Sequence, residues 1–250
     1  MNKPDASTVS FGFREVSAEE KPRLVRGVFD SVAARYDMMN DLMSFGLHRL
    51  WKNALITALK PRAGMKLLDL AGGTGDVSFR ALERAPEMRI TLCDINAAML
   101  EQGRARAFDR NVFRAIDWVC GDAQALPLPD NSFDACTIAF GIRNVTHIDK
   151  ALAEIKRVLK PGGHFLCLEF SPRPNMALEK IYDAYSFHVL PCMGKLVAGD
   201  AEAYRYLAES IRRFPPPETF EKMMKAAGFG ATRWRNLSGG VVALHSGWRV

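Results

Sequence analysis

The sequence lacks any run of about 18 consecutive apolar residues, which is the minimum that a membrane-spanning helix requires. Its first segment, residues 1–21, carries several acids and no apolar stretch, so it resembles neither a secretory signal nor a transit peptide. We therefore expect a cytoplasmic protein whose only membrane contact is peripheral, on the inner face.

Patterns typical of metal sites and disulfides are also absent. Five cysteines stand at positions 93, 120, 136, 167 and 192, with no Cys-x-x-Cys pair and no histidine cluster at metal-ligand spacing. Four of them fall in apolar, strand-like runs. We interpret them as reduced thiols that fill space in the core, and we expect no metal site.

Charge of one sign is not concentrated in any part of the chain. The 34 Lys and Arg residues outnumber the 28 Asp and Glu residues, and they are scattered without an appended RNA-binding segment. We therefore expect no nucleic-acid partner. The net charge of +6 suits an anionic surface, either RNA or acidic lipid, without requiring one, and we expect peripheral contact with an anionic membrane.

Short apolar runs alternate with helical patterns from residue 66 onward, in a chain of 250 residues that is long enough for one domain with a substantial core. Apolar side chains at three- and four-residue spacing after residue 147 predict a crossover helix, which Pro161 and two glycines end. This alternation predicts an α/β fold with a mostly parallel sheet and helices on both faces. The expected strands cover residues 66–71, 89–95, 118–122, 133–140 and 164–170.

The segments outside this core have patterns of their own. Apolar residues at helical spacing predict an amphipathic helix over residues 24–43. An aromatic stretch broken by Pro191 predicts a helical insertion, and a short helix follows it. The last residues predict a β-hairpin that turns at residues 239–240.

The stretch "LDLAGGTGDVSFR", residues 68–80, places three glycines between the first strand and a helix. Such a turn lets a ligand approach the main chain, and the start of the helix offers free N–H groups. A dinucleotide-binding turn, G-x-G-x-x-G, is matched only in part, because Ser78 stands where the last glycine belongs. The alternative is the nucleoside pocket of an S-adenosylmethionine-dependent methyltransferase, which the acid Asp69 ahead of the loop favours.

Acids also end the second and third expected strands. Asp94 lies 19 residues after Gly75, where a carboxylate accepts hydrogen bonds from both ribose hydroxyls. Asp122 offers an acceptor for an adenine amine, and the N–H of Ala123 can meet a ring nitrogen. A helix cap is the alternative for Asp122. Acids at three consecutive strand ends favour an isolated adenosine as the ligand.

Several motifs resemble a known family in order and spacing. "LDLAGGTGD", "CDIN", "GDAQALPLPDNSFD", "FGIRNV" and "VLKPGG" resemble the class I methyltransferases. "VFDSVAARYDMMNDLMSFGLHRLWK", "GDAEAYRYLAESI" and "LSGGVVALHSG" extend the likeness to the ubiquinone/menaquinone biosynthesis C-methyltransferase family, often called UbiE, from Phe11 onward. The resemblance implies a Rossmann-like class I fold with a mostly parallel seven-stranded sheet and a closing C-terminal β-hairpin.

On this basis the chain is interpreted as a single methyltransferase domain, residues 1–250, with four parts. These are an N-terminal helical cap (1–60), a cofactor-binding core (61–171), a helical substrate-side insertion (172–210), and a closing helix and hairpin (211–250).

The resemblance implies methyl transfer from S-adenosyl-L-methionine, without a metal, to a ring carbon of a polyprenylated quinol. The family's acceptors are 2-methoxy-6-polyprenyl-1,4-benzoquinol and demethylmenaquinol, and either or both remain open here. Other quinone-biosynthesis enzymes are expected partners. Where close relatives often have serine, this chain has Ala139, so a side-chain hydrogen bond is lost there. The expected cofactor-binding residues are Tyr36, Gly73, Thr74, Gly75, Asp94, Asp122 and Ala123.

The acceptor needs activation, because a quinol carbon attacks only after the adjacent hydroxyl has lost its proton. Arg143 and Asn144 follow the fourth strand, where Arg143 would stabilise the phenolate or orient a water and Asn144 would hold a quinol oxygen. His188 is the candidate base, since imidazole titrates near neutrality. The alternatives are an ion pair of Arg143 with a sheet-end acid, a His188 that is only packed, and a Tyr36 that belongs to its helix's apolar stripe.

Three other functions are weighed against this one. They are an NAD-dependent reductase, an RNA methyltransferase on the same fold, and a non-catalytic partner in a quinone-synthesising assembly. The apolar residues of segments 38–45 and 178–197 are expected to form the route for the polyprenyl tail and to contact anionic lipid.

Overall fold

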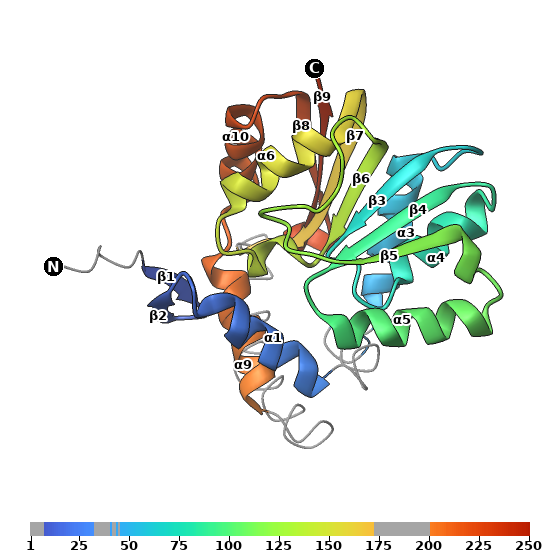
Figure 1. Cartoon of the computed structure of the whole chain (residues 1–250). Helices are drawn as coiled ribbons and strands as arrows, with labels where there is room; N and C mark the ends of the chain where they lie inside the picture. Colours follow the sequence, from blue (N-terminus) through green and yellow to red (C-terminus); the bar gives the residue numbers. More distant parts are fainter. Residues whose placement is uncertain (1–7, 33–40, 42–43, 45, 173–200) are drawn as a thin grey trace, which may run out of the picture.

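The structure is a computed structural model that describes residues 8–32, 41, 44, 46–172 and 201–250 (Figure 1). Its centre is a seven-stranded sheet in the order β5-β4-β3-β6-β7-β9-β8. Strands β3 to β7 are parallel, and β9 runs antiparallel between β7 and β8. The predicted fold class is confirmed. The strands are β3 (Lys66–Leu70), β4 (Arg89–Asp94), β5 (Ile116–Cys120), β6 (Phe133–Ala139), β7 (Leu159–Phe170), β8 (Phe229–Leu237) and β9 (Val242–Arg249).

The five expected parallel strands all form, with shifted ends. β5 begins two residues earlier than expected. The preceding helix ends at Val158 and β7 begins at Leu159, so Pro161 and the two glycines lie within the strand and do not end the helix as predicted. The C-terminal hairpin is also confirmed: a 3-10 turn, η5 (Ser238–Gly240), joins β8 to β9.

Helices cover both faces of the sheet, because successive strand residues point to opposite sides. On one face, Leu67 and Leu92 pack with residues of α3 and α4. On the other, Leu68 and Cys136 pack with residues of α6 and α10 (Figure 1). The helices are α3 (Leu47–Leu59), α4 (Asp76–Arg84), α5 (Ala97–Asp109), α6 (Ile148–Val158) and α10 (Pro217–Ala226).

The N-terminal part contains more than the expected helix. Strands β1 (Thr8–Phe11) and β2 (Arg14–Ser17) form an antiparallel pair that was not predicted in the segment interpreted as a helical cap. Helix α1 (Lys21–Val32) begins three residues before the expected start, and residues 33–40 of the predicted helix lie outside the described residues. The hairpin and α1 pack together against α9 (Ala201–Arg213).

The cysteines follow the expectation where they are described. Cys93, Cys136 and Cys167 are buried free thiols, whereas Cys120 is exposed and Cys192 lies outside the described residues. Burial raises the pKa of the Cys93 thiol to about 12, so it stays protonated and unreactive.

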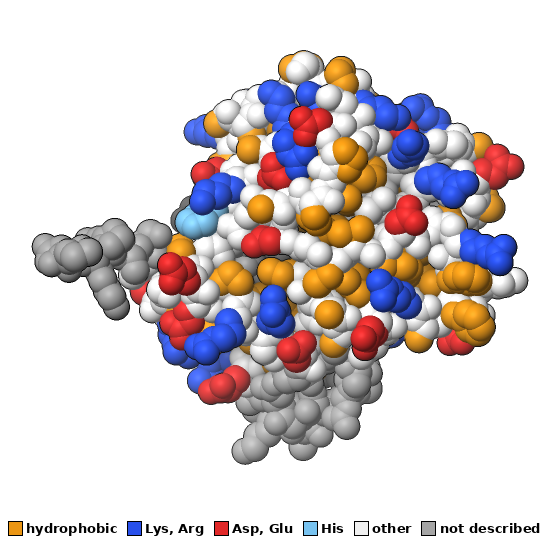
Figure 2. All heavy atoms as spheres, in the orientation of Figure 1, with side chains coloured by type: hydrophobic (Ala, Val, Ile, Leu, Met, Phe, Trp, Pro, Cys, Tyr) orange, Lys and Arg blue, Asp and Glu red, His pale blue; other side chains and the backbone are white. Residues whose placement is uncertain are grey.

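Two surface properties bear on partners. Within the described ranges, every helix is too short or too polar to cross a bilayer. Figure 2 shows basic and acidic side chains interspersed over the visible face, as the scattered charges of the sequence predicted.

Candidate functional site

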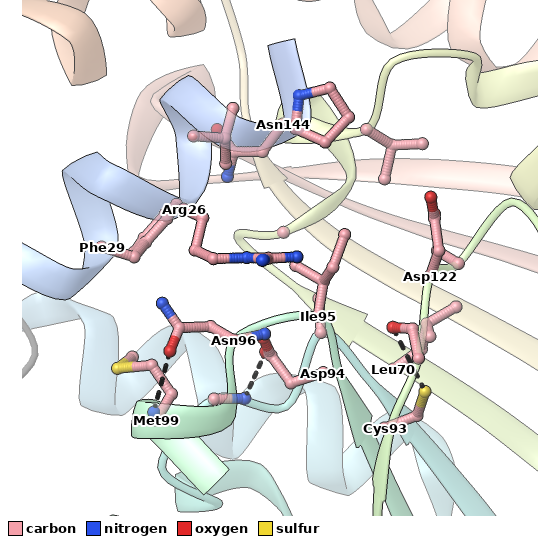
Figure 3. A pocket seen from close by; sticks show the side chains of 18 of the residues that line it. Arg26, Phe29, Leu70, Cys93, Asp94, Ile95, Asn96, Met99, Asp122 and Asn144 are labelled. Atoms are coloured by element: carbon pink, nitrogen blue, oxygen red, sulfur yellow. Dashed lines mark hydrogen bonds between the residues drawn. The ribbon is translucent and has the colours of Figure 1, made fainter. Parts of the chain in front are cut away.

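A cavity lies at the carboxyl ends of the central parallel strands and is covered by α1 (Figure 3). It encloses about 830 Å³, including the part open to solvent. The sheet order reverses beside it, since β3 neighbours β4 on one side and β6 on the other. Ligands of open α/β sheets bind at this kind of switch point.

The glycine loop after β3 forms one wall. Gly73 has a φ of 54° and Gly75 a φ of 87°, a region that glycine occupies without strain. A β-carbon on Gly72 would lie 2.6 Å from the Leu92 side chain, so only glycine fits where this backbone packs against the core. Of the three predicted loop residues, Gly73 lines the cavity, whereas Thr74 and Gly75 do not.

Thr74 supports the loop from behind. It is 2% exposed, and its hydroxyl accepts a hydrogen bond from the Arg106 guanidinium of α5 at 3.0 Å. The N–H of Gly75 donates to the carbonyl of Gly72 at 2.9 Å, which closes the turn that begins α4.

Asp94, the last residue of β4, points into the cavity (Figure 3). Its Oδ2 accepts from the backbone N–H of Gly73 at 2.9 Å, and its Oδ1 accepts from the N–H of Asn96 at 2.8 Å. Burial raises the pKa of Asp94, while these backbone hydrogen bonds oppose the rise. Each oxygen keeps a lone pair for a ligand hydroxyl.

Asp122 and Ala123 line the same cavity, beyond the end of β5. The Asp122 carboxylate accepts from the backbone N–H of Gln124 at 2.9 Å and from its side-chain amide at 3.1 Å. No helix begins after Asp122 in this described region, so the helix-cap alternative is wrong. Gln124 also accepts from the N–H of His147 at 2.9 Å, and sequence reasoning did not single it out.

Asp69 does not line the cavity, contrary to the expectation that all three strand-end acids face the ligand. It is 1% exposed, and its oxygens accept from the hydroxyls of Ser78 at 2.6 Å and Thr137 at 3.0 Å. Burial raises its pKa to about 6. Ser78, which interrupts the dinucleotide pattern, is therefore the hydrogen-bond partner of a buried acid.

Arg143 and Asn144, which follow β6, have different surroundings in the structure. Both belong to a 3-10 turn, η3 (Ile142–Asn144), but Asn144 lines the cavity and Arg143 does not. The Asn144 side-chain oxygen accepts from the Tyr206 hydroxyl of α9 at 3.0 Å. Arg143 donates to the buried carboxylate of Glu169 in β7 at 2.9 Å, which is the ion pair weighed as its alternative. Its catalytic role stays a prediction.

Two predicted site residues, Tyr36 and His188, lie outside the described residues, as do most of segment 38–45 and all of 178–197. Ala139 lines the cavity and brings no polar side chain to it. Among the residues that the structure describes, no group of three or more His, Cys, Asp or Glu side chains could hold a metal ion.

Helix α1 covers the cavity. The sequence predicted this segment only as an amphipathic helix with an apolar stripe. Val25, Arg26 and Phe29 line the cavity. Figure 3 shows Arg26 and Phe29 extending from this helix toward it. The end of the helix is held by Asp30, whose carboxylate accepts from the side-chain amide of Asn96 at 2.8 Å. Arg26 carried no signal in the sequence, because a basic residue on a helix is most often solvated.

An aromatic group forms the wall beside η3. The ring of Phe140 lines the cavity and lies 4.7 Å from that of Phe170 and 6.1 Å from that of Trp51, measured between centroids. Trp51 is fixed by a hydrogen bond from its indole N–H to the Ser238 hydroxyl at 2.8 Å. Phe140, supported by these two tilted rings, and the two pocket carboxylates suit a ligand with one aromatic and one polyhydroxylated part.

Solved structures with this fold include a SAM-dependent methyltransferase from Aquifex aeolicus. It has a TM-score of 0.57 and 16% identity, over 80% of this chain and 89% of that one. A second is the phosphoethanolamine N-methyltransferase 2 of Haemonchus contortus in complex with S-adenosyl-L-methionine. It has a TM-score of 0.57 and 21% identity, over 75% of this chain and 38% of that one. At these identities the likeness shows the fold alone.

Full-length relatives are much more similar. The ubiquinone/menaquinone biosynthesis C-methyltransferase UbiE of Methylobacterium nodulans is 59% identical, with 98% of each chain covered. The protein of the same name from Paracoccus denitrificans is 55% identical, with 100% of each chain covered. The model of the ubiE/COQ5 methyltransferase family matches residues 15–249. These findings give no support to a reductase or an RNA methyltransferase, and the chain belongs to the ubiE/COQ5 methyltransferase family.

Proposed function

We propose that this methyltransferase moves a methyl group from S-adenosyl-L-methionine to a ring carbon of a polyprenylated quinol. The acceptor is 2-methoxy-6-polyprenyl-1,4-benzoquinol, demethylmenaquinol or both, in keeping with the names of its full-length relatives. The observation that carries the proposal is the Asp94 carboxylate, held by two backbone N–H groups at the bare glycine loop.

The residues present fit the adenosine part of the donor. Asp94 has free lone pairs for two ribose hydroxyls, and the missing side chain of Gly73 leaves room for close approach. Asp122 would accept from the adenine amine, and the N–H of Ala123 would donate to the ring. Thr74 and Gly75 act indirectly by shaping the loop, and Tyr36 remains the candidate for the donor's carboxylate.

When bound, S-adenosyl-L-methionine supplies an electrophilic methyl group on its sulfonium. The protein must then orient the acceptor, exclude water and favour loss of a phenolic proton. Because Tyr206 donates to the Asn144 oxygen, the Asn144 amide nitrogen remains available to donate to a quinol oxygen. The Phe140 wall would hold the ring against the cavity.

Arg143 and His188 have the remaining proposed roles. The guanidinium of Arg143 is largely neutralised by Glu169, so we assign it chiefly to holding the η3 turn and, through its residual field, to favouring a phenolate. His188 is the candidate that takes the proton. The insertion that carries His188, together with residues 38–45, would cover the polyprenyl tail and bring the protein to an anionic membrane surface.

The test supplies methyl-labelled S-adenosylmethionine with each reduced acceptor and locates the label by mass spectrometry. We expect label on a ring carbon of at least one quinol and none when Asp94→Ala replaces the wild type. Binding of S-adenosylhomocysteine is measured in parallel. Label on a quinol oxygen, or no transfer by a protein that binds S-adenosylhomocysteine, would contradict the proposed acceptor.

A further inference from the structure

A second cavity lies next to the cofactor site and shares Val145 and Thr146 with its wall. It encloses about 620 Å³, including the part open to solvent. Its other walls come from the β1–β2 hairpin, the start of α1, η3 and the end of α9. The segment of Val145 and Thr146 therefore lies between the two cavities.

The described lining of this second cavity is basic. Lys21, Arg143 and Arg213 contribute cationic side chains, and no Asp or Glu belongs to the described lining. The hydroxyl protons of Tyr206 and Ser210 are already donated to Asn144 and to the Leu207 carbonyl, so the donors left for an anion are the cationic groups. Two acids stand just outside the lining: Glu15 acts on Lys21 and accepts from the Ser10 hydroxyl, and Glu209 accepts from the backbone N–H of Phe13. A cavity with this composition favours an anion.

The Lys21 ammonium is buried with few hydrogen bonds to offset its loss of hydration. It is 6% exposed, and its ammonium donates one long hydrogen bond, 3.3 Å, to the carbonyl of Val145. An ammonium has three N–H donors, and within the described part of the chain only one of them meets a hydrogen-bond acceptor. Burial lowers the pKa of Lys21, while Glu15 opposes this.

Arg143 contributes a second unsatisfied donor. Its Nη1 is paired with Glu169, but its Nε is buried without a hydrogen-bond partner in the described structure. The side chain is 4% exposed. Unpaired buried N–H groups are costly, and in native proteins they are normally matched by protein, water or ligand acceptors.

We propose that the second cavity binds a phosphate group, supplied either as free phosphate or as a phospholipid headgroup. Lys21, Arg143 and Arg213 come from three separate elements, and the oxygens of a tetrahedral phosphate point in enough directions to accept from all three. This site lies outside the cofactor cavity, although Arg143 has a proposed role in both, and phosphate binding is measured without any acceptor.

The residue that follows Gly12 of the cavity wall suits a phospholipid as the source of the phosphate. Phe13, in the turn between β1 and β2, is 50% exposed, and the Arg213 guanidinium lies 5.8 Å from its ring centroid. An exposed aromatic ring beside a cation is typical of residues that sit at a membrane interface. A headgroup phosphate in the cavity would place Phe13 at the level of the lipid.

The first experiment uses the full chain in phosphate-free buffer at constant ionic strength. Sodium phosphate is titrated against sodium chloride, with heat of binding and thermal unfolding as readouts. We expect a saturable signal for phosphate, weakened about tenfold or more in Arg213→Gln and in Lys21→Gln. The control Lys222→Gln removes one exposed charge from α10 and should bind like the wild type.

Arg213 is exposed, so its variant should fold normally, and its unchanged affinity for S-adenosylhomocysteine would show this. A phosphate response that equals the chloride response, or one that survives unchanged in both Arg213→Gln and Lys21→Gln, would overturn the proposal.

The second experiment separates the two phosphate sources. Vesicles of phosphatidic acid in phosphatidylcholine are compared with vesicles of phosphatidylcholine alone by co-sedimentation. A lipid source predicts binding that needs phosphatidic acid, falls in Arg213→Gln and Phe13→Ser, and persists in Lys222→Gln. A free-phosphate source predicts the saturable signal in solution with vesicle binding indifferent to Arg213. Indifference in both experiments refutes the site.

Discussion

Asp69 and Asp94 lie near the carboxyl ends of neighbouring strands, yet they have opposite surroundings. Asp69 pairs in register with Leu92, so it lies two residues deeper in the sheet than Asp94. At that depth both of its oxygens accept from protein hydroxyls, whereas Asp94 is held by loop N–H groups and faces the cavity. A displacement of two residues along a strand thus separates a structural acid from a ligand-binding one.

Glu169 extends the comparison to β7, because it is also a buried strand-end acid. Glu169→Gln would leave the Arg143 guanidinium buried without its counter-charge, which costs about 3–5 kcal/mol. We expect the free energy of unfolding in urea to fall by about that amount. Adding Arg143→Met should recover part of the loss. If Glu169→Gln is as stable as wild type, the pair is not the buried anchor described above.

Asp94→Ala tests the cavity side of the comparison. Each hydrogen bond to a charged group contributes about 1.5–3 kcal/mol, so loss of two ribose contacts should weaken S-adenosylhomocysteine binding by about 100-fold or more. Isothermal titration measures this. The matched control is Asp117→Ala, an exposed acid on β5, which should bind normally. Equal affinities for the two variants would remove Asp94 from the site.

Asp69→Asn tests the buried acid of the comparison through the pH dependence of the free energy of unfolding. The folded state raises the pKa of Asp69 to about 6 from an ordinary value of 3.8, so it holds the proton more tightly than the unfolded chain does. Wild-type stability should therefore fall as pH rises from about 4 to about 6, by up to about 3 kcal/mol.

The Asn side chain does not titrate, so Asp69→Asn lacks this loss. Its free energy of unfolding, relative to wild type, should increase by up to about 3 kcal/mol between pH 4 and pH 7. Urea titrations at four pH values measure the difference. Parallel profiles for the two proteins would place the Asp69 pKa near its ordinary value.

Tyr206→Phe tests Asn144, the uncharged polar residue that lines the cavity, and should change activity the least of these substitutions. The ring of Tyr206 stacks on Phe11 at 4.3 Å, and phenylalanine keeps this packing while releasing the Asn144 amide. We expect kcat for the quinol to fall about threefold to tenfold, with S-adenosylhomocysteine affinity unchanged. A parallel loss of cofactor affinity would instead indicate a general loosening of α9.

The sequence predicted most of the sheet and part of the site. The apolar runs located five strands because buried parallel strands are almost continuously apolar, and Asp94 and Asp122 were identified because acids after such runs stand out. Asp69 was wrongly expected to face the ligand, because a sequence pattern locates the end of a strand only to within a residue or two. A difference of two residues is enough to bury Asp69 inside the sheet. The β1–β2 hairpin was missed because four-residue strands are too short for a periodic signal.

Contacts between distant segments could not be predicted in the same way. An ion pair of Arg143 with a sheet-end acid was considered, but that acid could not be identified as Glu169, because the pairing depends on the register of β6 and β7. Gln124 and Arg26 reach the cavity through a turn and a covering helix, where no periodic pattern marks them. Side-chain direction, rather than residue type, was the missing information.

The reversed direction of β9 has a practical meaning for handling the protein. The strand starts beside the edge that holds the cavity and carries the chain away from it, so Val250, 83% exposed, ends at the opposite pole (Figure 1). A tag fused to the C-terminus could therefore attach the protein to a sensor surface with the cavity facing the solution. Ligands or lipid vesicles in that solution would then reach the cavity.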